Sequence, residues 1–140
     1  MDPLDGLRID VDQQRRFALV DWGAIEPTMP RAVALIERLL ADPAFRSEFG
    51  ILGDHRQLTA PPSTTYIDAL LDHLRRLQTS GRYVGPIAVL TPPQRTAVYG
   101  MARMTELKAD VPPLAGRIAA FTDFDAAVAW LTIGARAPGR

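Results

Sequence analysis

Three polar residues that could do chemistry, Asp54, His55 and Arg56, directly follow a short apolar run at 50–53. In open α/β sheets, ligands bind beyond the carboxyl ends of strands, so this junction is a candidate site. An aspartate and a histidine can act together as an acid–base pair. However, neighbouring residues on an extended chain point to opposite sides, so Asp54 and His55 should not touch. We therefore expect Asp54 to accept hydrogen bonds from loop amides and Arg56 to pair with a carboxylate, and we assign no catalytic residue.

Hydroxyl side chains lie at the start of the helix predicted after the proline-rich loop at 59–62. The first turn of a helix has unpaired N–H groups and the positive end of the helix dipole, so a phosphate on Ser63 would be well accommodated. The alternative is that one hydroxyl simply caps the helix. Thr65 and Asp68 also have the spacing of a capping box. The sequence favours a cap over phosphorylation.

The third predicted helix carries a cluster of distinctive residues. Tyr99 and Arg103 are four positions apart, so they can form a cation–π pair. Met101 and Met104 are three apart and share a neighbouring face, which we expect to point at the sheet. The arrangement has two interpretations. The methionines can simply pack in the core, which the sequence favours, or they can form the apolar floor of a small-ligand pocket whose polar rim is Tyr99 and Arg103. Gly100 costs a helix interior about 1 kcal/mol relative to alanine, so close packing or an approaching ligand should offset that cost.

Hydrophobic periodicity predicts the elements that position these residues. Leu7, Ile9 and Val11 alternate with charged residues, which indicates a half-buried strand, and the nearby second strand should pair with it as an antiparallel hairpin. Later apolar runs alternate with helical patterns, which implies right-handed crossovers and a mostly parallel sheet. The predicted fold is α/β, a single mixed sheet with helices in the order ββαβαβαβα, forming one domain over 1–133 and a flexible tail over 134–140. We expect strands near residues 7–11, 16–21, 50–54, 86–90 and 118–121.

Composition excludes several classes of function. Sixteen basic residues balance sixteen acidic ones, so the basic excess of a nucleic-acid-binding protein is missing. Two histidines and no cysteine give no credible zinc site, and no glycine-rich phosphate loop occurs, so we expect neither a metal nor a cofactor. No apolar run reaches the roughly 20 residues of a membrane span, and we expect a cytoplasmic protein.

Four segments carry a family resemblance: DPAFR at 42–46, GDHR at 53–56, YGMARM at 99–104 and FTDFDAAVAWL at 121–131. Together they resemble the SpoIIAA-like members of the STAS superfamily, and the likeness runs from about Phe17 to Leu131. The resemblance implies a mixed sheet with helices, related in shape to CRAL-TRIO lipid-binding domains. Antagonist members of the superfamily carry a phosphorylatable serine in an Asp-Ser-Ser-Gly-like motif. The matching stretch at 62–65 lacks the aspartate and the glycine, so phosphorylation of Ser63 is not expected.

The resemblance implies two functions, because STAS relatives bind proteins, nucleotides or small apolar ligands and as a class are not enzymes. The first is a non-enzymatic regulatory or protein-interaction module, with the loop at 56–65 and the helix at 94–107 as its contact surface. The second is a carrier or sensor of a small apolar, lipid-like ligand near Met101 and Met104. The residues expected to bind the ligand or partner are Asp54, Arg56, Ser63, Tyr99, Met101, Arg103 and Met104. The sequence leaves the partner, the ligand and a homodimer open.

Overall fold

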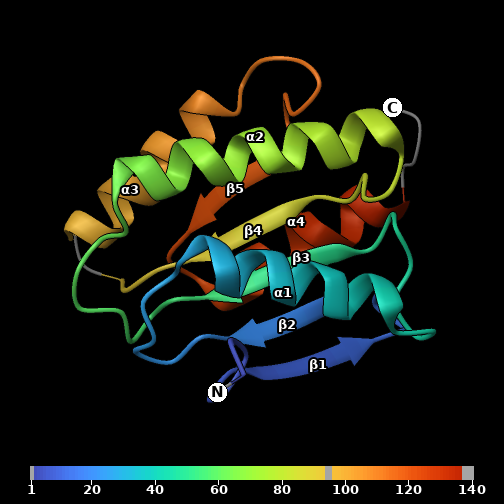
Figure 1. The fold of residues 1–140 in the computed structure, drawn as a ribbon, viewed down its shortest axis with the longest axis horizontal. Coiled ribbons are helices and arrows are strands. Elements are labelled where there is room, and N and C mark those ends of the chain that lie inside the picture. Colours follow the sequence, from blue (N-terminus) through green and yellow to red (C-terminus); the bar gives the residue numbers. More distant parts are fainter. Residues whose placement is uncertain (1, 94–95, 137–140) are drawn as a thin grey trace.

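Across residues 2–93 and 96–136, which the computed structural model describes, the chain forms five strands and four helices (Figure 1). The element order is the predicted ββαβαβαβα. The elements are β1 (Arg8–Asp12), β2 (Phe17–Asp21), α1 (Met29–Ala41), β3 (Gly50–Asp54), α2 (Thr64–Ser80), β4 (Ile87–Leu90), α3 (Ala97–Lys108), β5 (Ile118–Phe121) and α4 (Phe124–Arg136).

The strands form one mixed sheet in the order β1-β2-β3-β4-β5. β1 is antiparallel to β2, whereas β2, β3, β4 and β5 are mutually parallel. The predicted α/β fold with a single mixed sheet and an antiparallel first strand is therefore confirmed. β3 lies in the middle of the sheet, and its residue Gly53 pairs with Val20 on one side and Val89 on the other.

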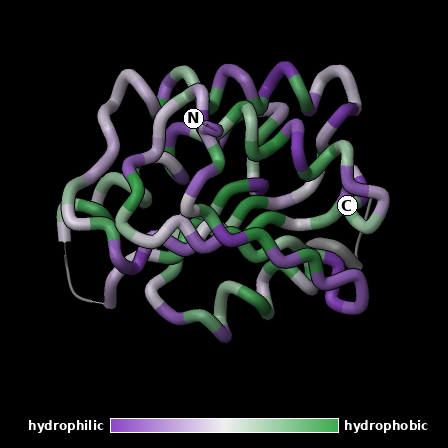
Figure 2. The backbone as a smooth tube through the Cα atoms, turned by 60° about the horizontal axis from the view of Figure 1, so that its bottom comes forward, coloured by the Kyte–Doolittle hydropathy of each residue, from purple (hydrophilic) through white to green (hydrophobic). Residues whose placement is uncertain are grey.

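Helices cover both faces of the sheet. Parallel strands that follow one another in a single direction place right-handed crossover helices on one face, and α1, α2 and α3 share that face, whereas α4 packs on the other (Figure 1). Successive strand residues point to opposite faces, so the sheet feeds two separate cores. On β3, Ile51 packs toward α1 and α2, and Leu52 packs toward α4. Figure 2 shows mostly hydrophobic strands in the centre of the molecule, with helices on both sides that carry hydrophilic as well as hydrophobic residues.

The buried stripe of α3 differs from the one predicted. Val98, Ala102 and Thr105 are buried against the sheet. Met101 is only partly buried, and Met104 is 41% exposed. The prediction that both methionines point at the sheet is wrong for Met104, because positions 98, 102 and 105 recur at i, i+4 and i+7 and define the true inner face. The methionines lie to one side of that face.

Gly100 lies on the exposed side of α3. A methyl group added there would meet no atom within 4 Å, so neither packing nor a close contact offsets the glycine. We expect Gly100→Ala to raise the free energy of unfolding by about 1 kcal/mol, because alanine is the better helix former. Urea unfolding of the wild type and the variant measures this difference, and an unchanged or lower midpoint would mean that the backbone of α3 is contacted there.

The last helix extends past the predicted end of the domain. α4 runs to Arg136, so the helix continues into the predicted tail of 134–140, and residues 137–140 lie outside the described part of the chain. Within the described residues, none of the helices combines the length and the apolar character needed to cross a bilayer.

Candidate functional site: an apolar cavity beside His55

Two adjoining cavities lie between the sheet and its helices, against β3 and β4. One, of about 70 Å³, lies between α2, α3 and β4. The other, of about 90 Å³, lies between α1, α2 and the central strands. Both are lined almost entirely by apolar side chains, and they share four residues: His55, Tyr66, Leu70 and Val89. Each is several times larger than the roughly 10–15 Å³ that a water molecule needs.

A glycine in the central strand accounts for part of this space. Ile51, Gly53 and His55 alternate onto the same face of the sheet, the face that α1 and α2 cover. A methyl group on Gly53 would lie 3.5 Å from Nε2 of His55 and 3.6 Å from Nε1 of Trp22, which are ordinary contact distances. The strand thus has no side chain at a point where one would fit, and two ring nitrogens border the gap.

The backbone of His55 is fixed in the sheet, and its side chain extends into the cavities. Its N–H donates to the carbonyl of Leu90 at 2.8 Å, and its carbonyl accepts from the N–H of Leu58 at 3.0 Å. The imidazole lies against the buried ring of Trp22, with ring centroids 5.1 Å apart. Nδ1 is buried and has no hydrogen-bond partner among the described residues. Burial lowers the pKa of His55 to about 4, although the charge of Asp54 opposes this shift. The imidazole is therefore neutral at physiological pH.

Three hydroxyl groups complete the polar part of the lining. Thr91 is fully buried and its hydroxyl donates to the carbonyl of Phe121 at 3.4 Å, while the hydroxyl of Thr105 donates to the carbonyl of Met101 at 2.9 Å. Burial raises the pKa of Tyr66 well above its usual range, so its phenol keeps its proton. The cavities thus contain neutral polar groups spread among apolar walls, the usual composition of a small-molecule site.

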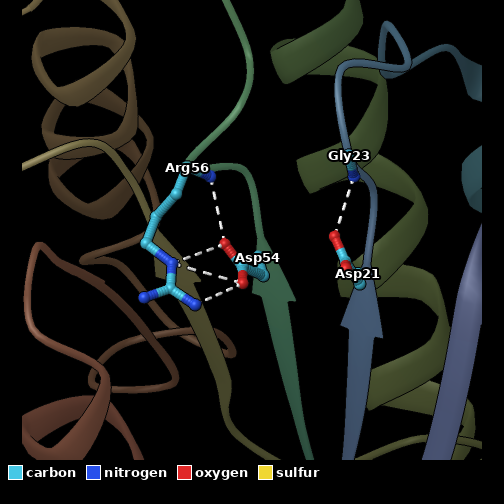
Figure 3. A network of polar contacts seen from close by, with 4 residues as sticks. All are labelled: Asp21, Gly23, Asp54 and Arg56. Atoms are coloured by element: carbon cyan, nitrogen blue, oxygen red, sulfur yellow. Dashed lines mark hydrogen bonds and ion pairs between the residues drawn. The ribbon is translucent and has the colours of Figure 1, made fainter.

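Asp54 and Arg56 satisfy each other at the end of β3 (Figure 3). Asp54 alternates with Gly53 and His55 along the strand, so it points away from the cavities. Arg56 donates through Nη2 to Oδ2 of Asp54 at 2.8 Å and through its backbone N–H to Oδ1 at 3.0 Å. Burial raises the pKa of the Asp54 carboxyl, but the bonds from Arg56 outweigh it and hold the pKa below 3.8. The guanidinium also lies over the ring of Phe124, 5.8 Å from its centroid. The predicted amide and carboxylate pairings are confirmed, and this cluster fixes the loop after β3.

The same loop geometry recurs on β2. Oδ1 of Asp21 accepts from the N–H of Gly23 at 2.9 Å, and Asp21 is the register partner of Asp54 (Figure 3). Two aspartates at adjacent strand ends each bind an amide two residues further along the chain. Both carboxylates therefore serve their own loops.

Ser63 is the N-cap of α2, as predicted. Its Oγ accepts from the N–H of Tyr66 at 3.0 Å, and the helix begins at Thr64, so Thr65 lies inside the helix and is not the cap. We expect Ser63→Ala to cost about 1 kcal/mol of stability and Ser63→Asp to cost much less, because aspartate caps as well as serine. Thermal unfolding of both variants measures this, and a Ser63→Ala protein as stable as the wild type would show that the cap contributes nothing.

The remaining predicted residues lie away from the cavities. Nη1 of Arg103 pairs with Oε1 of Glu106 at 2.7 Å, and within the described residues no cation–π contact joins it to Tyr99, so that predicted pair is wrong. A charge-assisted pair one helical turn away competes better for the guanidinium than a ring does. None of the predicted binding residues lines either cavity: Asp54, Arg56, Ser63, Tyr99, Met101, Arg103 and Met104. The part of α3 that does so is Val98, Ala102 and Thr105.

The sequence holds a signal that could have found this site. In the run at 50–55, the alternation of strand residues assigns Ile51, Gly53 and His55 to one face, so a glycine precedes a histidine on a buried surface.

Comparison with protein-family models, curated proteins and solved structures finds no match to this chain.

Proposed function

We propose that the protein binds a small, largely apolar molecule between its sheet and the helices α1, α2 and α3, and acts as a carrier or sensor of it. The observation that carries the proposal is the pair of adjoining apolar cavities, of about 70 and 90 Å³, that meet at His55. An apolar cavity of about 150 Å³ accommodates benzene, so the combined space suits a single ring or a short chain. The resemblance to SpoIIAA-like proteins, which implies a shape related to lipid-binding domains, supports the same conclusion.

A second candidate is a regulatory protein-interaction module that uses the outer face of α3. Met104 is 41% exposed, Leu107 65% and Val111 49%, and the first two share one helical face. Large exposed apolar side chains are typical of protein contacts. A homodimer formed through this face would dissociate in Leu107→Glu, which sedimentation velocity would show. If the wild type sediments as a monomer and Leu107→Glu has the same sedimentation coefficient, this face does not bind a second copy of the chain.

Binding of toluene tests the first candidate directly. The methyl signals of Leu70 and Val89 should shift in NMR spectra as toluene is added, because both residues line both cavities. Gly53→Ala should weaken the affinity about tenfold or more, since the added methyl occupies the space beside the two rings. The fold should tolerate the change, because the new contacts are of ordinary length.

Gly100→Ala is the matched control, because it adds the same methyl group where nothing lies within 4 Å. Its toluene affinity should equal that of the wild type. Absence of any shift in the wild type, or equal affinities in the wild type and Gly53→Ala, would refute the proposed site.

A further inference from the structure

The indole of Trp22 is a hydrogen-bond donor held in the wall of the larger cavity. Trp22 follows β2, and its backbone is fixed at both ends. Its N–H donates to the carbonyl of Asp54 at 3.1 Å, and its carbonyl accepts from the N–H of Ile25 at 3.1 Å. The ring lies against His55, with centroids 5.1 Å apart, and the residue is 4% exposed. The sheet and the imidazole therefore set the position of this donor before a ligand arrives.

The ring nitrogen of this tryptophan faces the gap at Gly53. A methyl group built on the glycine would lie 3.6 Å from Nε1 of Trp22, and both residues line the cavity. Within the described residues, no hydrogen bond involves Nε1. Unlike Nδ1 of His55, this nitrogen keeps accessible surface. Because buried indole N–H groups usually have a hydrogen-bond partner, an acceptor atom of a ligand in this gap would satisfy it.

The chemistry of the donor and of the walls restricts the ligand. An indole N–H only donates and has no alternative tautomer, so it bonds to an oxygen with a free lone pair. Among the described residues that line the cavities, none is an aspartate, glutamate, lysine or arginine. A buried charge without a partner is strongly unfavourable, so the oxygen should belong to a neutral group. A carbonyl group meets both conditions.

We propose that the bound molecule is neutral and largely apolar and carries an acceptor oxygen, such as that of a ketone or an ester, that hydrogen-bonds to Nε1 of Trp22. This inference rests on the ligand-binding function proposed above. The bond selects among molecules of equal size, because a hydrocarbon in the same position leaves the indole donor unpaired, and an unpaired buried donor is unfavourable.

Cyclohexanone and methylenecyclohexane test the proposal, because they share a ring and a size and differ only where a carbonyl oxygen replaces a methylene group. In NMR spectra of the isotope-labelled wild type, the indole N–H proton signal of Trp22 should move downfield with cyclohexanone and much less with methylenecyclohexane. The other tryptophan, Trp130, packs against Phe121 on the α4 face, so its indole signal should stay in place with both probes. Trp130→Phe assigns the two signals.

Affinities for the same two probes measure the bond. In Trp22→Phe, which keeps an aromatic ring and loses the donor, the affinity for cyclohexanone relative to methylenecyclohexane should fall about fivefold. The space that the smaller ring frees acts on both probes, and their different hydration cancels when the ratio is compared between proteins. Trp130→Phe is the matched control, because it makes the same substitution on the other face of the sheet, and its ratio should equal that of the wild type.

The outcomes separate the two proposals. If both probes bind the wild type and the Trp22 indole signal moves no further with the ketone, the acceptor assignment is wrong and the apolar site stands. This result does not depend on the folding of Trp22→Phe. An unchanged affinity ratio in folded Trp22→Phe would also overturn the assignment. Failure of both probes to bind the folded wild type would refute the ligand site itself.

Discussion

Lowering the pH from 6.5 to 4 should destabilise the protein by about 3 kcal/mol through His55. Burial lowers the pKa of this imidazole to about 4 in the folded state, whereas in the unfolded chain it titrates near 6.5. Below 6.5 the unfolded state therefore binds a proton that the folded state does not. The contribution of the neutral imidazole is fully present above pH 6.5 and is lost as the pH falls through about 4. Urea unfolding across this range measures the slope.

His55→Phe isolates this effect. The groups around the imidazole are Asp54 beside it, Tyr66 from α2 and the uncharged ring of Trp22, while α1 contributes only apolar side chains. Asp54 has a pKa held below 3.8, so its carboxyl titrates below this range. Burial also lowers the pKa of His73, which adds a slope of the same sign in both proteins. The pH dependence of the free energy of unfolding in His55→Phe should therefore lack only the contribution of His55. A slope equal to that of the wild type would show that water reaches the imidazole.

A methyl group at Gly85 should cost about 3 kcal/mol or more. The added carbon would lie 2.7 Å from Oη of Tyr83 and closer still to the carbonyl oxygen of Phe49. That carbonyl accepts the Tyr83 hydroxyl at 2.8 Å, and the N–H of Val84 donates to the carbonyl of Ser47 at 2.9 Å. The segments before β3 and β4 are bonded together here, so neither backbone can move without breaking those bonds. Thermal unfolding of Gly85→Ala measures the loss.

The same substitution elsewhere provides the comparison. Gly53→Ala makes only ordinary contacts and Gly100→Ala makes none, so both should unfold near or above the wild-type midpoint. One methyl group thus probes a crowded site, a partly empty one and an open one. A Gly85→Ala protein as stable as these two would contradict the tight packing between the segments that precede β3 and β4.

The sequence predicted the fold well because the fold depends on local patterns. Apolar alternation in β1 and the short apolar runs of β3 and β5 specify strands, and 50–54 and 118–121 are the bounds observed. Ser63 was predictable as a cap for the same reason, since its partner is three residues away. Prolines and glycines mark most of the boundaries between these elements.

The site was not predictable in the same way, because it depends on distances between elements that are far apart in sequence. The two methionines of α3 suggested a ligand-binding face. The buried face of this helix is instead set by its rotation about its own axis where it packs on β5, and Val98, Ala102 and Thr105 are buried there. The cavities arise from a missing side chain at Gly53 and from where α1 and α2 rest above it. Hydrophobic periodicity reports which side chains are inside, but not where they leave a space.

Native mass spectrometry of protein purified gently from its own cells, without detergent, tests the central claim most directly. We expect a species heavier than the bare chain, which loses a neutral mass on activation. Gly53→Ala purified in the same way should carry less of this adduct, because its methyl group narrows the cavity beside His55. Gly100→Ala should carry as much as the wild type. Detection of the bare chain alone, or of equal adducts on the wild type and Gly53→Ala, would contradict the claim that this cavity holds a ligand.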